Sequence, residues 1–492
     1  MRWQMLGSVV AAAASVALGI GRDSGAVGAP SAPPRLNVVV IVADDERLDE
    51  NSGMRNVQRL LARHGVSFAQ YVATTPECAP SRATILTGRS PDHTGVTANF
   101  GPHGYASFDE RSTLATWLHD AGYTTALVGK YLNDYTLDGD HRIPPGWDRW
   151  VALDSVPEER YYRYTLDENG REVYYGRRPK DYSTTVLTRK AVGFLRSARG
   201  PFFLYFAPVA PHLPAIPAPI DRGSIGRLPP LRSPAFDEAD ISDKPWHARF
   251  ERSFTEGGID YELNEVRRRQ LETLRSLDRS VGEIVRALRR RGQLDRTLIV
   301  YVSDNGFLWG EHRLGGKIWP YEESIHLPLV VRTPWQAGDG TVDPHLVLNT
   351  DLAPTIAALA GVHPGLAEDG RSLLPLLHGR SGGHWRTSGL VEYRGPGQLR
   401  RGGPPPFRAV RTRRFLYVAY DNGWRELYDL RRDPWELRNL AGERRYAATE
   451  LSLARRLVRL AGLPRLTAIR LTEVRAAVSA GSSPRDRGRS GR

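Results

Sequence analysis

The sequence predicts an α/β fold with a largely parallel sheet, because short apolar runs alternate with helical patterns along the chain. The apolar runs are NVVVIVA (37–43), TTALVG (124–129), FFLYFA (202–207), TLIVYVS (297–303) and LPLVVR (327–332). Continuous runs of this length, rich in β-branched residues, are typical of strands buried on both faces of a sheet. Residues 266–291 place Leu, Ile and Val at spacings of three and four, which predicts a long helix with one apolar face. A shorter helical pattern covers residues 56–64.

The first residues of the chain predict a targeting sequence. Arg2 precedes an apolar stretch from Met5 to Ile20, and the small residues of GAVGAP follow. This order favours a signal peptide over residues 1–29 and a linker over residues 30–36, and therefore a secreted or extracytoplasmic protein. The apolar stretch is short for a membrane span, and a retained N-terminal anchor is the alternative. No later segment is apolar enough for a stable membrane span.

The pattern of the chain changes after residue 384, which predicts a second, smaller domain. FRAVRTRRFLYVAY and the residues that follow it suggest antiparallel strands, and a helix is expected at about 446–460. We therefore predict a large domain over residues 37–384 and a smaller C-terminal α+β domain with an antiparallel sheet over residues 385–465. Residues 466–492 are polar and basic, and we expect this tail to be disordered.

The formal net charge of +13 favours an anionic partner, such as nucleic acid, an acidic membrane or a sulfated or phosphorylated polymer. The alternative is that the arginines are spread over solvated faces and serve no partner. The sequence contains neither a stripe of basic and aromatic residues nor a nucleic-acid-binding motif, so we expect no nucleic-acid partner.

Polar side chains follow four of the predicted strands, at the point where each strand ends. In chain order they are Asp44 and Asp45, Lys130, His212, and Asp304 and Asn305. Any one of them is also ordinary turn or helix-cap chemistry. Ligands bind beyond the carboxyl ends of the strands in open α/β sheets, so the whole set at one edge favours a site.

The oxygen-rich side chains at this edge predict a hard divalent cation. Asp44, Asp45, Asp304 and the amide oxygen of Asn305 are donors that Ca²⁺ and Mg²⁺ prefer, whereas zinc favours His and Cys. Three carboxylates close together repel one another and raise one another's pKa values unless a cation lies among them. A bound metal would remove that conflict.

Cys78 is the only cysteine, so an exported chain of this kind has no internal disulfide. Pro80 suits the first turn of a helix that ends at Gly88, which places residue 78 near a helix N-terminus, where negative charge is favoured. Arg82 lies four residues on and falls on the same helix face, where its guanidinium suits a tetrahedral oxyanion. The alternatives are a buried structural thiol and an unmodified thiolate nucleophile of lowered pKa.

These residues resemble the signature of the sulfatase family. Cys78-Ala79-Pro80-Ser81-Arg82, continuing to Thr87-Gly88, matches C-x-P-S-R-x-x-x-x-T-G at each fixed position. Asp304-Asn305-Gly306 with Gly310-Glu311-His312 and Lys317 is similar to the segment S-D-H/N-G…G-E-H…K of that family. Residues 428–440 resemble its closing stretch Y-D-L-x-x-D-P-x-E-x-x-N-L. The resemblance covers about residues 36–465, assigns the catalytic domain to 37–384, and implies an alkaline-phosphatase-like large domain.

The resemblance implies a calcium-dependent sulfatase, with Ca²⁺ preferred to Mg²⁺, in which a formylglycine-generating enzyme oxidises Cys78 before folding. The hydrated aldehyde attacks sulfur, the cationic side chains stabilise the sulfate charge, and His212 protonates the leaving alcohol. The implied metal ligands are Asp44, Asp45, residue 78, Asp304 and Asn305. The implied catalytic residues are Cys78, Arg82, Lys130, His212 and Lys317. His312 is expected close to the site, in a supporting role.

One position departs from the pattern of many sulfatases, which carry a His two residues after the strand-end lysine. Leu132 occupies that place, and Asn133 cannot act as a base, so the proton acceptor for sulfate release is not identified. GKYLN (129–133) and PPGWDRW (144–150) are instead similar to the N-acetylglucosamine-6-sulfatase branch and its bacterial relatives. The resemblance thus implies a sulfated glycan, such as 6-O-sulfated N-acetylglucosamine, or a small aryl sulfate as substrate.

Two other functions stay open from the sequence. The first is hydrolysis of phosphate mono- or diesters at the same metal site with an unmodified nucleophile. The second is a catalytically silent protein that binds sulfated glycans. The complete signature around Cys78 disfavours the first, and the presence of every implied ligand and catalytic residue disfavours the second.

Overall fold

A computed structural model describes residues 35–135, 142–154, 160–229, 231–245, 260–335, 340–380, 383–395 and 403–464. The predicted signal peptide (1–29), most of the predicted linker (30–36) and the predicted tail (466–492) lie outside the described residues. Among the described helices, none combines the length and the apolar character that a membrane span requires.

A ten-stranded mixed sheet forms the centre of the structure, with the strand order β12-β2-β11-β8-β1-β7-β3-β4-β5-β6. The five adjacent strands from β8 to β4 run parallel to one another. They are β8 (Thr297–Ser303), β1 (Asn37–Ala43), β7 (Phe202–Ala207), β3 (Thr124–Gly129) and β4 (Arg149–Leu153). The parallel centre confirms the predicted α/β fold.

Antiparallel pairs at both sides of the centre make the sheet mixed. β11 is antiparallel to both β8 and β2, β12 is parallel to β2, and β5 is antiparallel to both β4 and β6. The bounds are β2 (Gly65–Val72), β11 (Leu329–Arg332), β12 (Thr341–Leu348), β5 (Tyr164–Glu168) and β6 (Glu172–Tyr175). The run 327–332 therefore forms a strand as predicted, but it enters the sheet in the opposite direction.

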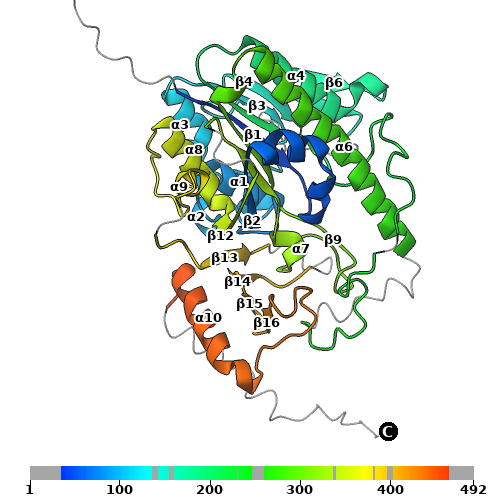
Figure 1. The fold of residues 1–492 in the computed structure, drawn as a ribbon, viewed down its shortest axis with the longest axis vertical. Helices are drawn as coiled ribbons and strands as arrows, with labels where there is room; N and C mark the ends of the chain where they lie inside the picture. The colour runs from blue at the N-terminus through cyan, green and yellow to red at the C-terminus, as the bar shows by residue number, and fades with distance from the viewer. Residues whose placement is uncertain are drawn as a thin grey trace, which may run out of the picture. The chain divides into compact units, whose positions relative to one another are not determined.

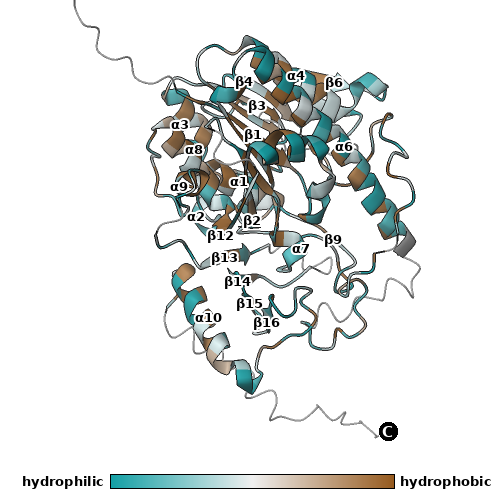
Figure 2. Ribbon diagram, viewed as in Figure 1, coloured by the Kyte–Doolittle hydropathy of each residue, from teal (hydrophilic) through white to brown (hydrophobic). Residues whose placement is uncertain are grey.

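Helices cover both faces of the sheet because its central strands are apolar on both sides (Figures 1 and 2). Val38, Val40 and Val42 of β1 face one apolar cluster, and Val39 and Ile41 face the other, as the alternation of side chains along a strand requires. The first face packs against α1 (Cys78–Thr87), α3 (Leu114–Asp120), α8 (Leu352–Ala360) and α9 (Leu374–Leu377). The second packs against α4 (Ser183–Ser197) and α6 (Asp260–Arg290).

The helix predicted over 266–291 corresponds to α6, which begins a few residues earlier. The pattern over 56–64 forms a π-helical segment, Val57–Leu61, and a 3-10 turn, Ala62–His64. Its first turn is held from outside, because the carboxylate of Asp278 in α6 accepts hydrogen bonds from the backbone of Asn56 and Val57. Shorter elements are α2 (Pro91–Thr94), α7 (Glu322–Ile325), β9 (Leu308–Trp309) and β10 (Gly315–Gly316).

A four-stranded antiparallel sheet and one helix form the C-terminal part, as the sequence predicts. The strands are β13 (Ser388–Tyr393), β14 (Phe407–Thr412), β15 (Phe415–Tyr420) and β16 (Arg425–Asp429), and the helix is α10 (Ala447–Leu460). α10 covers one face of this sheet, where Leu453 and Leu457 pack against Val410, Tyr417 and Leu427. The other face packs against residues around β9 and α7 of the large sheet domain. The domain boundary between residues 384 and 385, which lies between α9 and β13, stays a prediction.

Gly129 at the end of β3 allows the backbones of β3 and β7 to approach closely. It has a φ of 126°, and a Cβ atom placed there would lie 2.1 Å from the carbonyl oxygen of Ala207. We therefore expect Gly129→Ala to lower the free energy of unfolding by more than about 2 kcal/mol. Urea denaturation measures this change.

The control is Gly193→Ala in α4, where nothing lies within 4 Å of the added Cβ. Alanine is the better helix former, so this variant should gain up to about 1 kcal/mol. Equal effects at the two positions would contradict the close approach at Gly129.

Candidate active site

The strand register brings the predicted strand-end residues to one edge of the large sheet. Ala43 lies opposite Ser303, and Gly129 lies opposite Ala207, so the next residues of these parallel strands leave the sheet together. The backbone continues the pairing for one more step. Asp44 N–H donates to Ala210 O at 3.1 Å, Asp304 N–H donates to Ala43 O at 3.2 Å, and Lys130 N–H donates to Ala207 O at 2.7 Å.

Acidic and polar side chains converge beyond this edge. Asp44, Asp45, Cys78 and His212 each offer a ligand atom, and these four atoms lie within 4.8 Å of one another. Asn305 joins them by donating from Nδ2 to Asp45 Oδ1 at 2.6 Å. The left-handed backbone of Asp45 (φ 76°) bends the chain away from the strand direction directly after Asp44. The structure thus brings together residues that the sequence spreads over more than half of the chain.

Asp304 is held on the other side of this cluster by a buried ion pair. Its Oδ2 accepts from Arg82 Nε at 2.7 Å, and both side chains are fully buried. Its Oδ1 accepts hydrogen bonds from the backbone N–H groups of Asp45 and Asn305. Burial raises the pKa of Asp304 to about 6, although the neighbouring charge of Arg82 opposes that rise.

Two lysines face the carboxylates. Lys130 Nζ donates to Asp44 Oδ2 at 2.8 Å, and Lys317 Nζ lies 2.5 Å from Asp45 Oδ1 and 2.7 Å from Cys78 Sγ. Burial alone would raise the pKa of Asp44. The positive charges around it, of which that of Lys130 has the largest effect, hold this pKa well below its usual value.

Helix α1 begins at Cys78, as the sequence predicts, and ends at Gly88 in a left-handed conformation. Ala79 N–H at its first turn donates to Asn99 Oδ1 at 2.8 Å, and Ser81 Oγ donates to Asp304 O at 2.5 Å. Burial raises the pKa of the Cys78 thiol to about 12, against the opposing charges of Lys130 and Lys317. This environment disfavours the alternative of an unmodified thiolate of lowered pKa at neutral pH.

His212 lies at the rim of the cluster, with its Nε2 3.7 Å from Asp45 Oδ2. Its Nδ1 lies 2.6 Å from Leu213 O, which favours the tautomer that carries the proton on Nδ1. Burial lowers the pKa of His212 to about 4, so the ring is neutral around pH 7. Arg160 contacts the same ring, with Nη1 3.3 Å from Nδ1.

Arg160 is a site residue that the sequence analysis missed. It lies outside regular secondary structure and belongs to no recognised motif, so only the fold reveals its place. It lines a small cavity of about 30 Å³ together with Phe100, Lys130, Leu132 and other residues. Leu132 is buried there among apolar neighbours, so this position offers no proton acceptor.

The structure places His312 in a different cluster from the one around Cys78. Its Nδ1 lies 2.7 Å from Glu238 Oε2, and its ring lies 4.1 Å from that of Tyr321. His312 forms a potential metal-binding cluster with Glu323 and Glu436. Among the described residues, no hydrogen bond or ion pair of its side chain reaches the residues around Cys78.

The residues present fit a hard cation. Asp44, Asp45, Asp304 and Asn305 are each at most 1% exposed, and all of them carry oxygen donors. Asn305 Oδ1 is buried and has no hydrogen-bond partner among the residues that the structure describes. A buried acceptor without a partner is costly, and a cation bound beside it would remove that cost.

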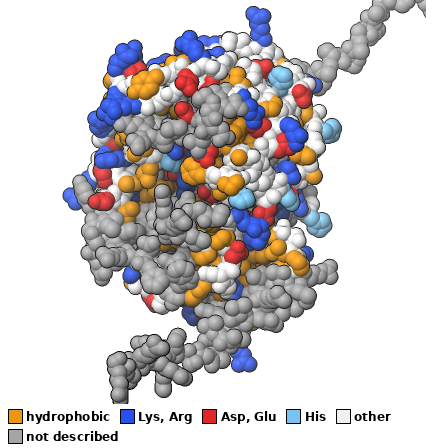
Figure 3. Space-filling view, turned by 180° about the vertical axis from the view of Figure 1, so that it is seen from behind, with side chains coloured by type: hydrophobic (Ala, Val, Ile, Leu, Met, Phe, Trp, Pro, Cys, Tyr) orange, Lys and Arg blue, Asp and Glu red, His pale blue; other side chains and the backbone are white. Residues whose placement is uncertain are grey.

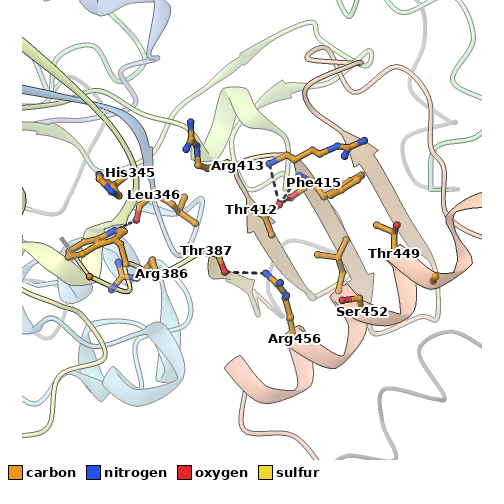
Figure 4. A pocket seen from close by; sticks show the side chains of 15 residues that line it. His345, Leu346, Arg386, Thr387, Thr412, Arg413, Phe415, Thr449, Ser452 and Arg456 are labelled. Atoms are coloured by element: carbon orange, nitrogen blue, oxygen red, sulfur yellow. Dashed lines mark hydrogen bonds between the residues drawn. The ribbon is translucent and has the colours of Figure 1, made fainter. Parts of the chain in front are cut away.

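A separate cavity of about 730 Å³ lies between the end of β12, the strands β14 and β15, and α10 (Figure 4). Arg386, Arg413, Arg414 and Arg456 line it, but Arg386 pairs with Asp351 and Arg414 pairs with Asp429. None of the predicted site residues lines this cavity. On the face shown in Figure 3, Lys and Arg are interspersed with Asp and Glu, which agrees on that face with the alternative of solvated arginines.

Comparison with known families and proteins supports the resemblance seen in the sequence. A family model described as Sulfatase matches residues 36–362, and one described as N-sulphoglucosamine sulphohydrolase, C-terminal, matches residues 310–462. The N-acetylglucosamine-6-sulfatase of Homo sapiens is 34% identical over 396 residues, which cover 77% of this chain and 71% of that protein.

An extracellular sulfatase SULF-1 homolog of Drosophila melanogaster is 34% identical over 377 residues, which cover 73% of this chain. The chain spans only 33% of the length of that protein. A solved structure, in complex with its substrate D-glucosamine-2-N,6-O-disulfate, has a TM-score of 0.76 and 25% identity and covers 89% of this chain and 99% of its own. This likeness confirms the predicted fold class, including its alkaline-phosphatase-like large domain.

The buried pair of Arg82 and Asp304 gives a stability prediction. Arg82→Met leaves a buried carboxylate without its cation, so the free energy of unfolding should fall by about 3–5 kcal/mol. Adding Asp304→Asn to the same chain should recover part of this loss, which a double-mutant cycle in urea measures.

Arg111 provides the matched control, because its ion pair with Asp109 is solvent-exposed. Arg111→Met should change the stability by less than about 1 kcal/mol. An effect of Arg82→Met no larger than that of Arg111→Met would contradict the importance of the buried pair.

Proposed function

This chain belongs to the sulfatase family, and we propose that it hydrolyses sulfate esters of sulfated carbohydrates. The observation that carries the proposal is the convergence of Lys130, Lys317 and Arg82 on the carboxylates around Cys78. Such a cluster combines a nucleophile position, a site for a cation and three positive charges for an anionic ester. A 6-O-sulfated N-acetylglucosamine is the favoured substrate, because relatives named N-acetylglucosamine-6-sulfatase align over most of the chain.

The proposed cofactors are Ca²⁺ and a formylglycine made from Cys78 by a formylglycine-generating enzyme. Asp44, Asp45, Asp304 and Asn305 would hold the cation together with residue 78. The first four residues are buried and offer oxygen donors, and the Oδ1 of Asn305 has no partner among the described residues, which supports Ca²⁺. When bound, the cation and the modified side chain supply positive charge and the nucleophilic oxygen.

The cationic residues bind and orient the sulfate group in this proposal. The guanidinium of Arg82 is fixed in direction because Nε donates to Asp304 and Nη1 donates to Lys130 O at 3.0 Å. The ammonium group of Lys317, in the loop after β10, lies 2.7 Å from Cys78 Sγ, and that of Lys130, at the end of β3, lies 2.8 Å from Asp44 Oδ2. Fixed donors of this kind stabilise charge that moves onto the sulfate oxygens without having to reorganise.

We assign both proton transfers to His212. It is the one histidine among the described residues of this cluster, and Leu132 removes the alternative at the end of β3. In the first step the neutral ring of His212 would accept the proton of the attacking hydroxyl of the hydrated residue 78 and pass it to the leaving alcohol. In the second step it would accept the proton of the remaining hydroxyl as sulfate leaves, and then release that proton to solvent. His212 would end the cycle neutral, as it began, which agrees with its lowered pKa.

We also propose that the protein is exported by the leader at residues 1–29. The proteins similar to this chain include relatives named as extracellular sulfatases, which supports this assignment. The proposed partners are the sulfated glycan and, before folding, the formylglycine-generating enzyme.

The first test compares three substrates and examines residue 78. Wild-type enzyme should hydrolyse glucosamine 6-sulfate and aryl sulfate faster than a phosphodiester, and Cys78→Ala should lose at least about a thousandfold in kcat. Mass spectrometry of the peptide that contains Cys78 should find an aldehyde.

An alkylatable thiol in all active protein would exclude the formylglycine mechanism. Preferred hydrolysis of the phosphodiester would favour the phosphate ester hydrolase. If protein with an aldehyde and bound Ca²⁺ releases no sulfate but retains sulfated glycan, the silent glycan-binding function gains support.

The double role of His212 predicts a burst. With an aryl sulfate, whose leaving group needs little protonation, His212→Gln should release about one equivalent of phenol per enzyme and then slow by about 10²–10⁴-fold. Stopped-flow absorbance measures the burst, and intact-mass analysis should detect the sulfated enzyme. Steady turnover without a burst would show that another group accepts the proton.

A further inference from the structure

A second cluster of ligand-type side chains lies outside the candidate active site. His312, Glu323 and Glu436 each offer one ligand atom, and the three atoms lie within 4.8 Å of one another. The residues come from three separate places. His312 follows β9, Glu323 belongs to α7, and Glu436 follows β16 of the C-terminal sheet.

Each of these residues has a buried polar atom that lacks a hydrogen-bond partner among the described residues. The three atoms are His312 Nε2, Glu323 Oε2 and Glu436 Oε1. The side chain of His312 is fully buried, and that of Glu436 is 1% exposed. Buried polar groups almost always have partners, so three unpaired ones in a single cluster indicate a missing ligand rather than a local defect.

The outer contacts of His312 are those of a metal-binding histidine. Its Nδ1 lies 2.7 Å from Glu238 Oε2, and Lys244 Nζ donates to the other oxygen of Glu238 at 3.1 Å. A carboxylate on one ring nitrogen fixes the orientation of the ring and leaves the other nitrogen for a ligand. Nε2 is the nitrogen that remains.

The charges around the cluster are out of balance. The nearby cations serve other acids, because Arg411 pairs with Glu322 and Arg47 pairs with Glu311. Glu323 and Glu436 form no ion pair with any residue in the described part of the chain.

We propose that His312, Glu323 and Glu436 bind a divalent transition-metal cation, such as Zn²⁺ or Mn²⁺. One imidazole nitrogen with two carboxylates suits these ions better than Ca²⁺, which prefers oxygen donors throughout. The site is distinct from the cluster around Cys78 and shares no residue with it.

The position of this site suggests a structural role for the metal. His312 and Glu323 stand on either side of Lys317 in the chain, and the segment between them contains residues in left-handed conformations. These are His312 (φ 55°), Arg313 (φ 57°) and Ile318 (φ 78°). Such conformations cost free energy in non-glycine residues, and an ion bound by His312 and Glu323 at the two ends of the segment would offset that cost. The ion would also join the segment to the C-terminal sheet through Glu436.

Metal analysis of the intact purified protein tests the proposal without using sulfatase activity. The probes are ZnCl₂ and MnCl₂ supplied during purification, with metal content read by inductively coupled plasma mass spectrometry. Wild-type protein should hold one transition-metal ion per chain. Asp45→Asn, which alters only the cluster around Cys78, should keep that ion, so failure of the proposed calcium site would be seen separately.

Glu436→Gln and His312→Asn should each lose the ion, and their melting temperatures should become insensitive to added Zn²⁺. The matched control is Glu426→Gln, which alters another buried carboxylate of the C-terminal sheet outside the cluster. This variant should retain the ion. If either test variant fails to fold, anomalous diffraction from wild-type crystals at the zinc or manganese edge locates the ion directly.

Wild-type protein without a transition-metal ion, or with one that Glu436→Gln and His312→Asn both retain, would overturn the proposal. In that case the three groups would share protons or a buried water instead.

Discussion

The need to neutralise three buried carboxylates controls the arrangement of the active site. Asp44, Asp45 and Asp304 meet at the carboxyl edge of the parallel strands, where they are almost completely inaccessible to solvent. Their mutual repulsion would be prohibitive without positive charge. Arg82 and Lys130 supply part of that charge from inside the large sheet domain. In the proposed function, the same cations that stabilise the acidic cluster also hold the anionic substrate, so folding stability and catalysis depend on the same contacts.

The C-terminal sheet contributes none of the residues around Cys78, but it supports one of them from behind. Lys317 comes from a loop that the sheet holds at several points. Arg411 of β14 pairs with Glu322, and Tyr321 Oη donates to Glu426 of β16. Glu436 then accepts a hydrogen bond from the backbone N–H of Glu322. Substitutions that destabilise the small sheet should therefore affect the active site by displacing the ammonium group of Lys317.

Much of the fold and of the site was predictable, for reasons that particular residues illustrate. The β-branched runs identified the central strands, and Asp44, Lys130 and Asp304 could be placed together because parallel strands end at one edge. Strand direction was less predictable, since 327–332 has the same apolar run whether it pairs parallel or antiparallel. His312 contacts Glu238 in a second cluster, and its expected supporting role at the site around Cys78 stays a prediction. The place of Arg160 could not be predicted from the sequence, because it lies in an irregular segment and contacts His212 only in the folded structure.

The burial of Cys78 has a consequence for the timing of biogenesis. Its side chain is fully inaccessible in the folded chain, at the edge of a sheet whose central pairing joins Val38 to Leu298. Pairing between such distant residues forms late and slowly, because a long loop must close first. The proposed oxidation of Cys78 thus competes kinetically with closure of the sheet. Any change that accelerates folding would shorten the interval in which the modifying enzyme can act, and so yield stable protein that is permanently inactive.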